Sequence, residues 1–204
     1  MKNYEENSPD VDIICLARQT SSRLPNKIFY EISGDTILNH ILKKLKQCNK
    51  NIIFAIPDNT LNDELAEKLV EKNIKVFRGS ETNVLQRFIE ASRLGKAEFV
   101  QRFCCDNLLF DPDYMKKCYL ELDKQDSIVF SNKACSNSAG QSVEIIRRRN
   151  CILQIDATEY ETEHVFPYFY KLFPKVHNLM CPTKEYFPID TIEDINRVKA
   201  SSFM

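Results

Sequence analysis

Short apolar runs alternate with amphipathic stretches along the first 130 or so residues of this 204-residue chain. The apolar runs have the length of buried strands and lie at 11–16, 51–56, 74–77, 98–103 and 127–131. Between the first two runs, Leu38, Ile41 and Leu45 fall on one face of a helix. Strands connected by helices form parallel sheets with helices on both faces. The sequence therefore predicts an α/β fold with a mostly parallel central sheet.

The intervening and later segments predict the remaining elements. We expect helices at 36–48, 62–72, 82–94 and 111–122, strands at 142–147 and 175–180, a helix over 161–173 that is interrupted or kinked near Pro167, and a last helix over 191–200. Thr191 and Asp194 are spaced as in a capping box at the start of that last helix. The length is that of one domain, which we place at 11–200. Residues 135–185 form its small β-rich or helical extension, and residues 1–10 a flexible N-terminal tail.

Composition excludes several classes of protein. The net charge of −1 gives no sign of a broad surface for nucleic acid or membranes. No apolar run approaches the roughly 18–20 residues that a membrane span needs, and the polar, acidic N-terminus is not a signal peptide. The eight cysteines contain no CxxC pair, which favours buried free thiols over a disulfide framework or a zinc site. We therefore expect a cytoplasmic protein that binds neither nucleic acid nor a membrane.

The loop at 17–27 directly follows the first predicted strand. It contains Arg18, Arg23 and Lys27, several hydroxyl and amide side chains, and no carboxylate. Open α/β sheets bind ligands at the carboxyl ends of their strands, and this set of cations and donors suits a polyphosphate. A solvated basic loop is the alternative on composition alone. With four glycines and neither GxxxxGK[ST] nor GxGxxG, a phosphate site here must depend largely on side chains, which counts against kinases and dehydrogenases.

Two aspartates are candidate metal ligands. Asp106 lies just past the fourth predicted strand, and Asp190 precedes the last helix. In isolation, each position favours a plainer interpretation: an ordinary loop aspartate for Asp106, and a helix N-cap or first-turn acid for Asp190. In a globule with a radius of gyration of roughly 17 Å the two carboxylates can meet. A carboxylate pair can hold Mg²⁺, with waters and substrate phosphates completing its shell. Beside the cationic loop, this combination predicts phosphoryl or nucleotidyl transfer.

Six sequence blocks, in order, match the pattern of one family. The blocks match A-R-x-x-S-x-R-L-P-x-K at 17–27 (with one residue of slack around the serines), F-R-G-S-x-x-D-V-L-x-R-[FY] at 77–88, R-x-x-x-D-x-P-L-x-D at 102–111, the G-x-x-x-E block at 142–144, E-H-V at 163–165 and [IV]-D-T-x-E-D at 189–194. From about residue 11 to 199 the chain resembles the cytidylyltransferases of the spore-coat polysaccharide biosynthesis type. These are relatives of CMP-KDO synthetase and the acylneuraminate cytidylyltransferases.

This resemblance implies a single GT-A-like (Rossmann-like) nucleotidyltransferase domain. It implies Mg²⁺-dependent transfer of CMP from CTP to a sugar or sugar-like acceptor, with release of pyrophosphate, for surface polysaccharide or glycoconjugate biosynthesis. Relatives are commonly dimers, so a homodimer is possible.

The resemblance also assigns residues to roles. The nucleotide-binding set is Ala17, Arg18, Ser22, Arg23, Lys27, Arg78, Gly79, Ser80 and Arg102; the metal ligands are Asp106 and Asp190; the acceptor-binding set is Glu144, Glu163 and His164; and the catalytic set is Arg18, Lys27 and Asp106. Arg18, Arg23 and Lys27 would bind the CTP phosphates, and Lys27 would stabilise charge at the α-phosphate. For His164, a general base and a structural histidine are both open.

The chain departs from the family pattern at a few positions. Asn83 replaces an aspartate, Cys104 and Cys105 replace small polar residues and glycine, and 107–108 replace x-Pro. Two alternatives follow. One is a GT-A glycosyltransferase that consumes a nucleotide-sugar, although the only local DxD-type motif, at 111–113, lies at a helix start. The other is a catalytically inactive homologue that acts as a binding protein.

Overall fold

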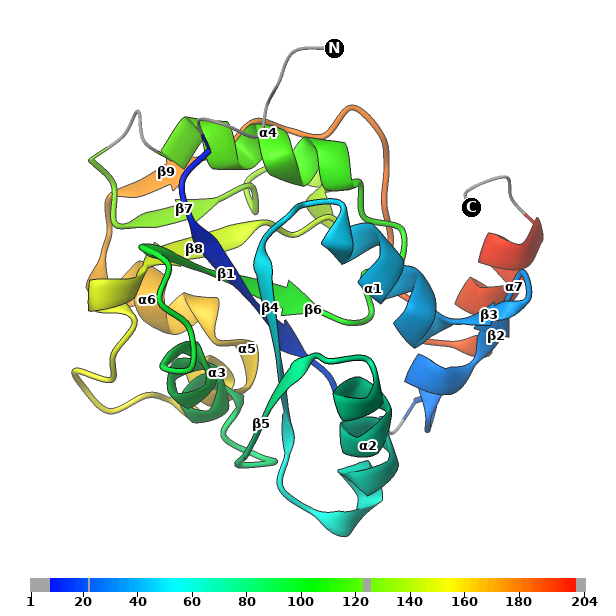
Figure 1. Ribbon diagram of the computed structural model, residues 1–204. Coiled ribbons are helices and arrows are strands. Elements are labelled where there is room, and N and C mark those ends of the chain that lie inside the picture. Colours follow the sequence, from blue (N-terminus) through cyan, green and yellow to red (C-terminus); the bar gives the residue numbers. More distant parts are fainter. Residues whose placement is uncertain (1–7, 22, 123–125, 201–204) are drawn as a thin grey trace.

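The computed structural model describes residues 8–21, 23–122 and 126–200, and it is built on one seven-stranded sheet (Figure 1). In spatial order the strands are β5 (Lys75–Gly79), β4 (Asn51–Pro57), β1 (Val11–Leu16), β6 (Phe99–Cys104), β8 (Glu144–Arg147), β7 (Val129–Ser131) and β9 (Val176–Asn178). Neighbouring strands are parallel except that β8 is antiparallel to both β6 and β7. The predicted α/β fold with a mostly parallel sheet is confirmed.

Helices cover both faces of this sheet (Figure 1). The buried apolar side chains of α1 (Ile37–Lys46), α2 (Asp63–Glu71), α4 (Pro112–Leu122) and α7 (Ile192–Ala200) belong to one cluster, and those of α3 (Val84–Ser92) and α6 (Phe166–Leu172) to another. Short α5 (Glu159–His164) packs against α3. In β1, Ile13 and Cys15 lie in the first cluster and Ile14 in the second, because successive strand side chains point to opposite faces. A strand buried on both faces therefore appears in the sequence as a nearly continuous apolar run, interrupted in β1 by the buried Asp12.

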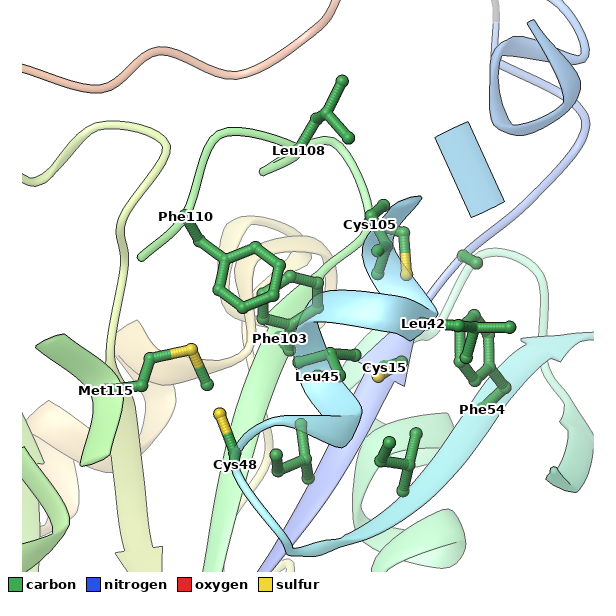
Figure 2. Close-up of a cluster of buried hydrophobic side chains, with 14 of the residues drawn as sticks. Cys15, Leu42, Leu45, Cys48, Phe54, Phe103, Cys105, Leu108, Phe110 and Met115 are labelled. Atoms are coloured by element: carbon green, nitrogen blue, oxygen red, sulfur yellow. The ribbon is translucent and has the colours of Figure 1, made fainter. Parts of the chain in front are cut away.

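The first cluster anchors the loop that carries Asp106. Figure 2 shows its side chains converging from α1, β1, β4 and β6. Phe103, at the end of β6, meets Phe110 edge to face with ring centroids 4.8 Å apart. Both rings are buried, and burying one such side chain contributes about 1.5–3 kcal/mol. This contact joins the two ends of the loop between β6 and α4.

The predicted helix over 161–173 is two helices in the structure. The break lies at Val165, a buried residue with φ 65° and ψ −68°. A β-branched residue rarely adopts positive φ. Pro167 lies in the first turn of α6, where proline is tolerated. The interruption is therefore a sharp turn at Val165, two residues before the proline.

Several other elements differ from their predictions. The strands expected at 142–147 and 175–180 are shorter, and both join the central sheet as β8 and β9. A small antiparallel hairpin was not predicted: β2 (Glu31–Ile32) pairs with β3 (Asp35–Thr36), and positive φ at Ser33 and Gly34 turns the chain between them.

The ends of the predicted domain are only partly described. Of the expected N-terminal tail, residues 1–7 lie outside the described residues. Ser8 and Pro9 are described, and both accept hydrogen bonds from Lys50 Nζ, at 2.9 and 2.8 Å. Within the described ranges, no helix has the length and apolar character required to cross a membrane.

One disulfide corrects the expectation that the cysteines are free thiols. Cys135 and Cys181 are bonded, with Cα atoms 5.5 Å apart, whereas Cys15, Cys48, Cys104, Cys105, Cys118 and Cys151 are free. The pair is separated by 46 positions in the sequence, so spacing gives no signal for it. The bond forms because β7 and β9 are neighbours in the sheet, and the segments that leave them run together.

Reduction of this disulfide is expected to lower the free energy of unfolding by about 3 kcal/mol, because the bond restricts the unfolded chain. Urea denaturation with and without a phosphine reductant measures the change. Cys135→Ser should have the reduced protein's stability under both conditions. Equal sensitivity of the wild type and Cys135→Ser to reductant would contradict the assignment.

Candidate active site

A cavity of about 430 Å³ opens beside the carboxyl ends of β1 and β6. Nine predicted site residues line it: Ala17, Arg18, Arg23, Lys27, Arg102, Asp106, Glu163, His164 and Asp190. They come from segments spread over most of the chain. The position agrees with the general rule that open α/β sheets bind ligands at the carboxyl ends of their strands.

Within the cationic loop at 17–27, Gln19 anchors the chain to the segment at 62–65. This buried residue receives a hydrogen bond from Leu65 N on its Oε1 (3.1 Å), and its own backbone N donates to Asn62 Oδ1 (3.0 Å). Asn26, with φ 56°, closes the loop by donating from its N to Gln19 O at 2.9 Å. Lys27 follows as the first residue of a 3₁₀ turn. The loop is therefore tied to the start of α2, and Lys27 has a defined position.

Lys27 joins the two candidate metal ligands. Its Nζ lies 3.1 Å from Asp190 Oδ1 and 4.0 Å from Asp106 Oδ2, and it donates to Ile189 O at 2.9 Å. The backbone N of Ile189 donates to Asp106 O at 2.7 Å. Arg23 Nη2 contacts the other oxygen of Asp190 at 3.1 Å. The two aspartates, distant in sequence, therefore lie on either side of Lys27, next to the cationic loop, and their role as metal ligands stays a prediction.

A capping box holds Asp190 in place. Asp194 Oδ2 accepts hydrogen bonds from the backbone N of Asp190 (2.9 Å) and of Thr191 (2.8 Å), and Thr191 Oγ1 accepts from Asp194 N (3.3 Å). Burial of Asp194 opposes its ionisation, but these hydrogen bonds outweigh it and lower the pKa. Thr191 thus caps α7, and the carboxylate of Asp190 faces Lys27 and Arg23.

Asp106 lies in a charged but poorly solvated environment. Burial raises the pKa of its carboxyl, Lys27 opposes this effect, and Asp190 adds to it. Two close carboxylates in such a place favour a nearby cation. Among the described residues no cluster of three or more His, Cys, Asp or Glu side chains could hold a metal ion. Two carboxylates beside an open cavity fit Mg²⁺, which keeps waters and takes substrate phosphates as further ligands.

Glu144, predicted to bind the acceptor, lies behind Arg102. Arg102 Nε donates to Glu144 Oε2 at 2.7 Å, and its Nη2 contacts the same oxygen. Tyr170 donates its hydroxyl to Oε1 at 2.6 Å; burial, together with Glu144, raises the pKa of Tyr170 and keeps this donor protonated. Arg102 Nη1 donates to His164 O at 3.4 Å. Glu144 therefore positions Arg102, which in turn contacts the backbone at the end of α5.

Three residues of the predicted nucleotide set do not line the cavity. Arg78 forms ion pairs with Asp58 (3.1 Å) and Asp63 (2.7 Å). Ser80 Oγ accepts a hydrogen bond from Asn83 N (3.0 Å), and Gly79 closes β5. Ser22, also in that set, lies outside the described residues. The base and ribose roles of Arg78, Gly79 and Ser80 remain predictions.

The departures from the family pattern have local explanations. Asn83 caps α3, since its Oδ1 accepts a hydrogen bond from Gln86 N at 2.9 Å. Cys104 and Cys105 line the cavity. Burial raises the pKa of Cys104 to about 12 and raises that of Cys105 as well. Both thiols therefore stay protonated and are weak nucleophiles.

The DxD-type motif at 111–113 caps a helix. Asp111 Oδ1 accepts from the backbone N of Asp113 (2.9 Å) and of Tyr114 (3.3 Å) at the start of α4. Asp113 is exposed and pairs with Lys116 at 2.5 Å. This motif does not line the cavity, which removes the one local feature that favoured a glycosyltransferase.

Sequence reasoning missed several lining residues. They are Leu16, Ser21, Ile28, Val84, Arg87, Cys104 and Cys105. Most are apolar or small and carry no chemical signal. Arg87 is the exception: it lies between the inward-facing Leu85 and Phe88 of the predicted helix, and a buried arginine is unusual, because arginine is seldom fully buried without a partner.

Comparison with known proteins shows which sequences this chain resembles. The family model described as Cytidylyltransferase matches residues 13–194. The spore coat polysaccharide biosynthesis protein SpsF of Bacillus subtilis (strain 168) is 26% identical over 211 residues, covering 94% of this chain and 85% of that protein. An uncharacterized protein of Methanocaldococcus jannaschii is 31% identical over 193 residues, covering 89% of this chain and 78% of its own length.

Solved structures of nucleotidyltransferases have a similar fold. A cytidylyltransferase from Leptospira borgpetersenii serovar Hardjo-bovis superposes with a TM-score of 0.81 at 25% identity, covering 94% of this chain and 85% of that one. CMP:2-keto-3-deoxy-manno-octonic acid synthetase, solved with CTP, shares the fold with a TM-score of 0.69 at 13% identity, covering 94% and 97%. The Rossmann-like nucleotidyltransferase fold expected from the sequence is confirmed.

Proposed function

Because this chain belongs to the cytidylyltransferase family and is a CTP-dependent nucleotidyltransferase, we propose that it transfers CMP from CTP to an oxygen of a sugar-like acceptor and releases pyrophosphate, with Mg²⁺ as cofactor. The observation that carries this proposal is the convergence of Lys27, Asp106 and Asp190 at one cavity. A cation between two carboxylates at the end of a phosphate-binding loop suits displacement at phosphorus.

The residues of the cavity would have separate roles in phosphate binding and metal binding. Arg18, Arg23 and Lys27 would neutralise the triphosphate, and Lys27 would stabilise the charge that develops at the α-phosphate. Asp106 and Asp190 would hold Mg²⁺, which when bound neutralises phosphate charge and organises the leaving pyrophosphate. Because Lys27 is held within 3.1 Å of Asp190, it needs little reorganisation to act there.

The acceptor side is formed by the end of α5. Glu163 and His164 line the cavity, and the ring of His164 lies 4.4 Å from that of Tyr160. Glu163 can accept hydrogen bonds from sugar hydroxyls, and His164 can accept the acceptor's proton. The similarity to the spore coat protein SpsF supports a product used in surface polysaccharide or glycoconjugate biosynthesis.

The experiment that tests the function measures pyrophosphate release with CTP and with the other three nucleoside triphosphates, across a panel of sugars and sugar phosphates. CTP alone should support release. A thermal-shift screen accompanies it, since a ligand at 100 times its Kd adds about 2.7 kcal/mol of stability. Absence of CTP binding, together with no release from any nucleotide, would overturn the proposal.

Magnesium dependence gives a separate prediction. CTP with Mg²⁺ is expected to raise the melting temperature more than CTP with EDTA, because Asp106 and Asp190 repel the triphosphate when no divalent ion lies between them. Readdition of excess Mg²⁺ should restore the full rise. Cytidine, which has no phosphate, serves as the control and should be insensitive to EDTA. Equal stabilisation by CTP in both conditions would contradict a metal-assisted site.

A further inference from the structure

Arg87 is a buried cation in the wall of the cavity. It lies in the first turn of α3, and only 2% of its surface is exposed. Its Nη1 donates to two backbone carbonyls, Ser80 O and Glu81 O, the latter at 3.3 Å. Its Nε is buried without a hydrogen-bond partner. In the described part of the chain, no acceptor receives a hydrogen bond from Nη2 and no carboxylate forms an ion pair with the guanidinium.

The other buried or half-buried cations of the cavity differ in this respect. Lys27 pairs with Asp190, and Arg102 pairs with Glu144. The charged group that most affects Arg87 is another cation, Arg18: burial, and then this guanidinium, lower the pKa of Arg87 to about 10. Arg87 is therefore still charged at neutral pH. An uncompensated buried charge is costly, so an anion that approaches it is strongly favoured.

We propose that Arg87 and Arg18 together form an anion subsite that binds the β- and γ-phosphate oxygens of the nucleotide. This inference rests on the proposed function for the identity of the ligand. Lys27 stands among carboxylates that suit a metal and the reacting phosphate. In the part of the chain that the structure describes, neither Arg18 nor Arg87 forms an ion pair with a carboxylate, and the attraction of Glu81 for Arg87 is weaker than the repulsion by Arg18. Two cations without an ion-paired carboxylate attract the most highly charged part of CTP. Guanidinium groups also match phosphate oxygens in geometry.

A merely structural role would use only part of the side chain. The contacts of Nη1 with Ser80 O and Glu81 O hold the loop between β5 and α3, and a lysine at this position could make one of them. The free Nε and Nη2 are not needed for that contact. The two roles therefore differ in what the rest of the guanidinium does, and ligands with and without terminal phosphates separate them.

The test is calorimetric titration of the full chain with inorganic pyrophosphate, CTP and CMP. Arg87→Gln should weaken pyrophosphate and CTP binding by about tenfold to a hundredfold, the range of a charged hydrogen bond. CMP, which has no β- or γ-phosphate, should change less than about twofold on this proposal. Arg93→Gln, at an exposed position just past the end of the same helix, is the matched control and should change none of the three.

The salt dependence of pyrophosphate affinity gives a second measurement, which a change in loop conformation alone should not alter. Arg87→Gln should reduce the dependence of pyrophosphate affinity on ionic strength, because one fewer cation contacts the ligand. Arg87→Lys keeps the charge and should retain that dependence, with an intermediate affinity. If Arg87→Gln fails to fold, Arg87→Lys alone decides: pyrophosphate affinity must fall more than CMP affinity.

The remaining outcomes separate failure of the anion subsite from failure of the proposed function. Equal losses for CMP and CTP, or no loss at all in Arg87→Gln, would overturn the subsite. If Arg87→Gln binds CTP and turns it over as the wild type does, the proposed function stands and the anion subsite is overturned. Pyrophosphate binding that requires Arg87, in a protein that does not bind CTP, would support the subsite and remove the cytidylyl transfer.

Discussion

Asp106→Asn is expected to lower the rate of CTP-dependent pyrophosphate release by a factor of about 10³, with the fold intact. The substitution preserves the shape of the side chain but removes the negative charge that a divalent ion requires. Burial and the neighbouring Asp190 already disfavour the ionised form of Asp106. Removal of this charge should therefore not lower the free energy of unfolding. A coupled pyrophosphate assay and a urea titration measure the two quantities.

Asp113→Asn is the control for that experiment. Asp113 lies seven residues further along, at the exposed start of α4, with 74% of its side chain in solvent. It should leave both rate and stability within error of the wild type. If Asp106→Asn retains more than about a tenth of the wild-type rate, well short of the loss expected for a metal carboxylate, Asp106 does not hold the catalytic ion.

Glu144→Gln is expected to lower the free energy of unfolding by about 3–5 kcal/mol, because it leaves Arg102 as a buried charge without a counter-charge. The two side chains are 3% and 16% exposed. The double variant with Arg102→Met should recover part of this loss, since it removes the orphaned cation. Urea denaturation of the two single variants and the double variant gives the coupling energy.

Glu98→Gln offers a matched ion pair at the surface. Glu98 pairs with Arg147, and 60% of its side chain is exposed. Its loss should cost less than about 1 kcal/mol, as is usual for exposed pairs. A similar small cost at Glu144 would show that solvent or another group compensates Arg102, and would remove Glu144 from the support of the site.

The sequence predicts the first half of the fold well because its signals are local. The inner strands are mostly apolar runs, as Val11–Leu16 is apart from Asp12, and helices such as α1 repeat their apolar residues at helical spacing. The loop at 17–27 and Asp106 could be assigned to the site because both follow inner strands of a parallel sheet. Asp190 is by itself indistinguishable from a helix cap, and it became a candidate only in combination with Asp106 and the cationic loop, before the family resemblance assigned it the same role.

The features that escaped prediction depend on partners distant in sequence. The Cys135–Cys181 bond requires that β7 and β9 be neighbours, and nothing in either segment specifies this. The turn at Val165 contradicts the residue's own preference and exists only because the packing on both sides imposes it. Arg87 belongs to a helix whose apolar side chains, such as Leu85 and Phe88, are buried in the core, so its contact with the cavity becomes visible only when β1 and α3 are placed together.

The pair between Arg102 and Glu144 also bears on how β8 finds its place between β6 and β7. The two residues lie directly opposite each other in the antiparallel ladder. Ile145 and Ile146 are buried in the clusters on opposite faces, so a shift by one residue would still bury an isoleucine on each face. Hydrophobicity alone therefore cannot specify the alignment of this strand. The same shift would move Glu144 to the other face and leave Arg102 and Tyr170 without their acceptor, so one charged pair distinguishes the native alignment from its nearest competitor.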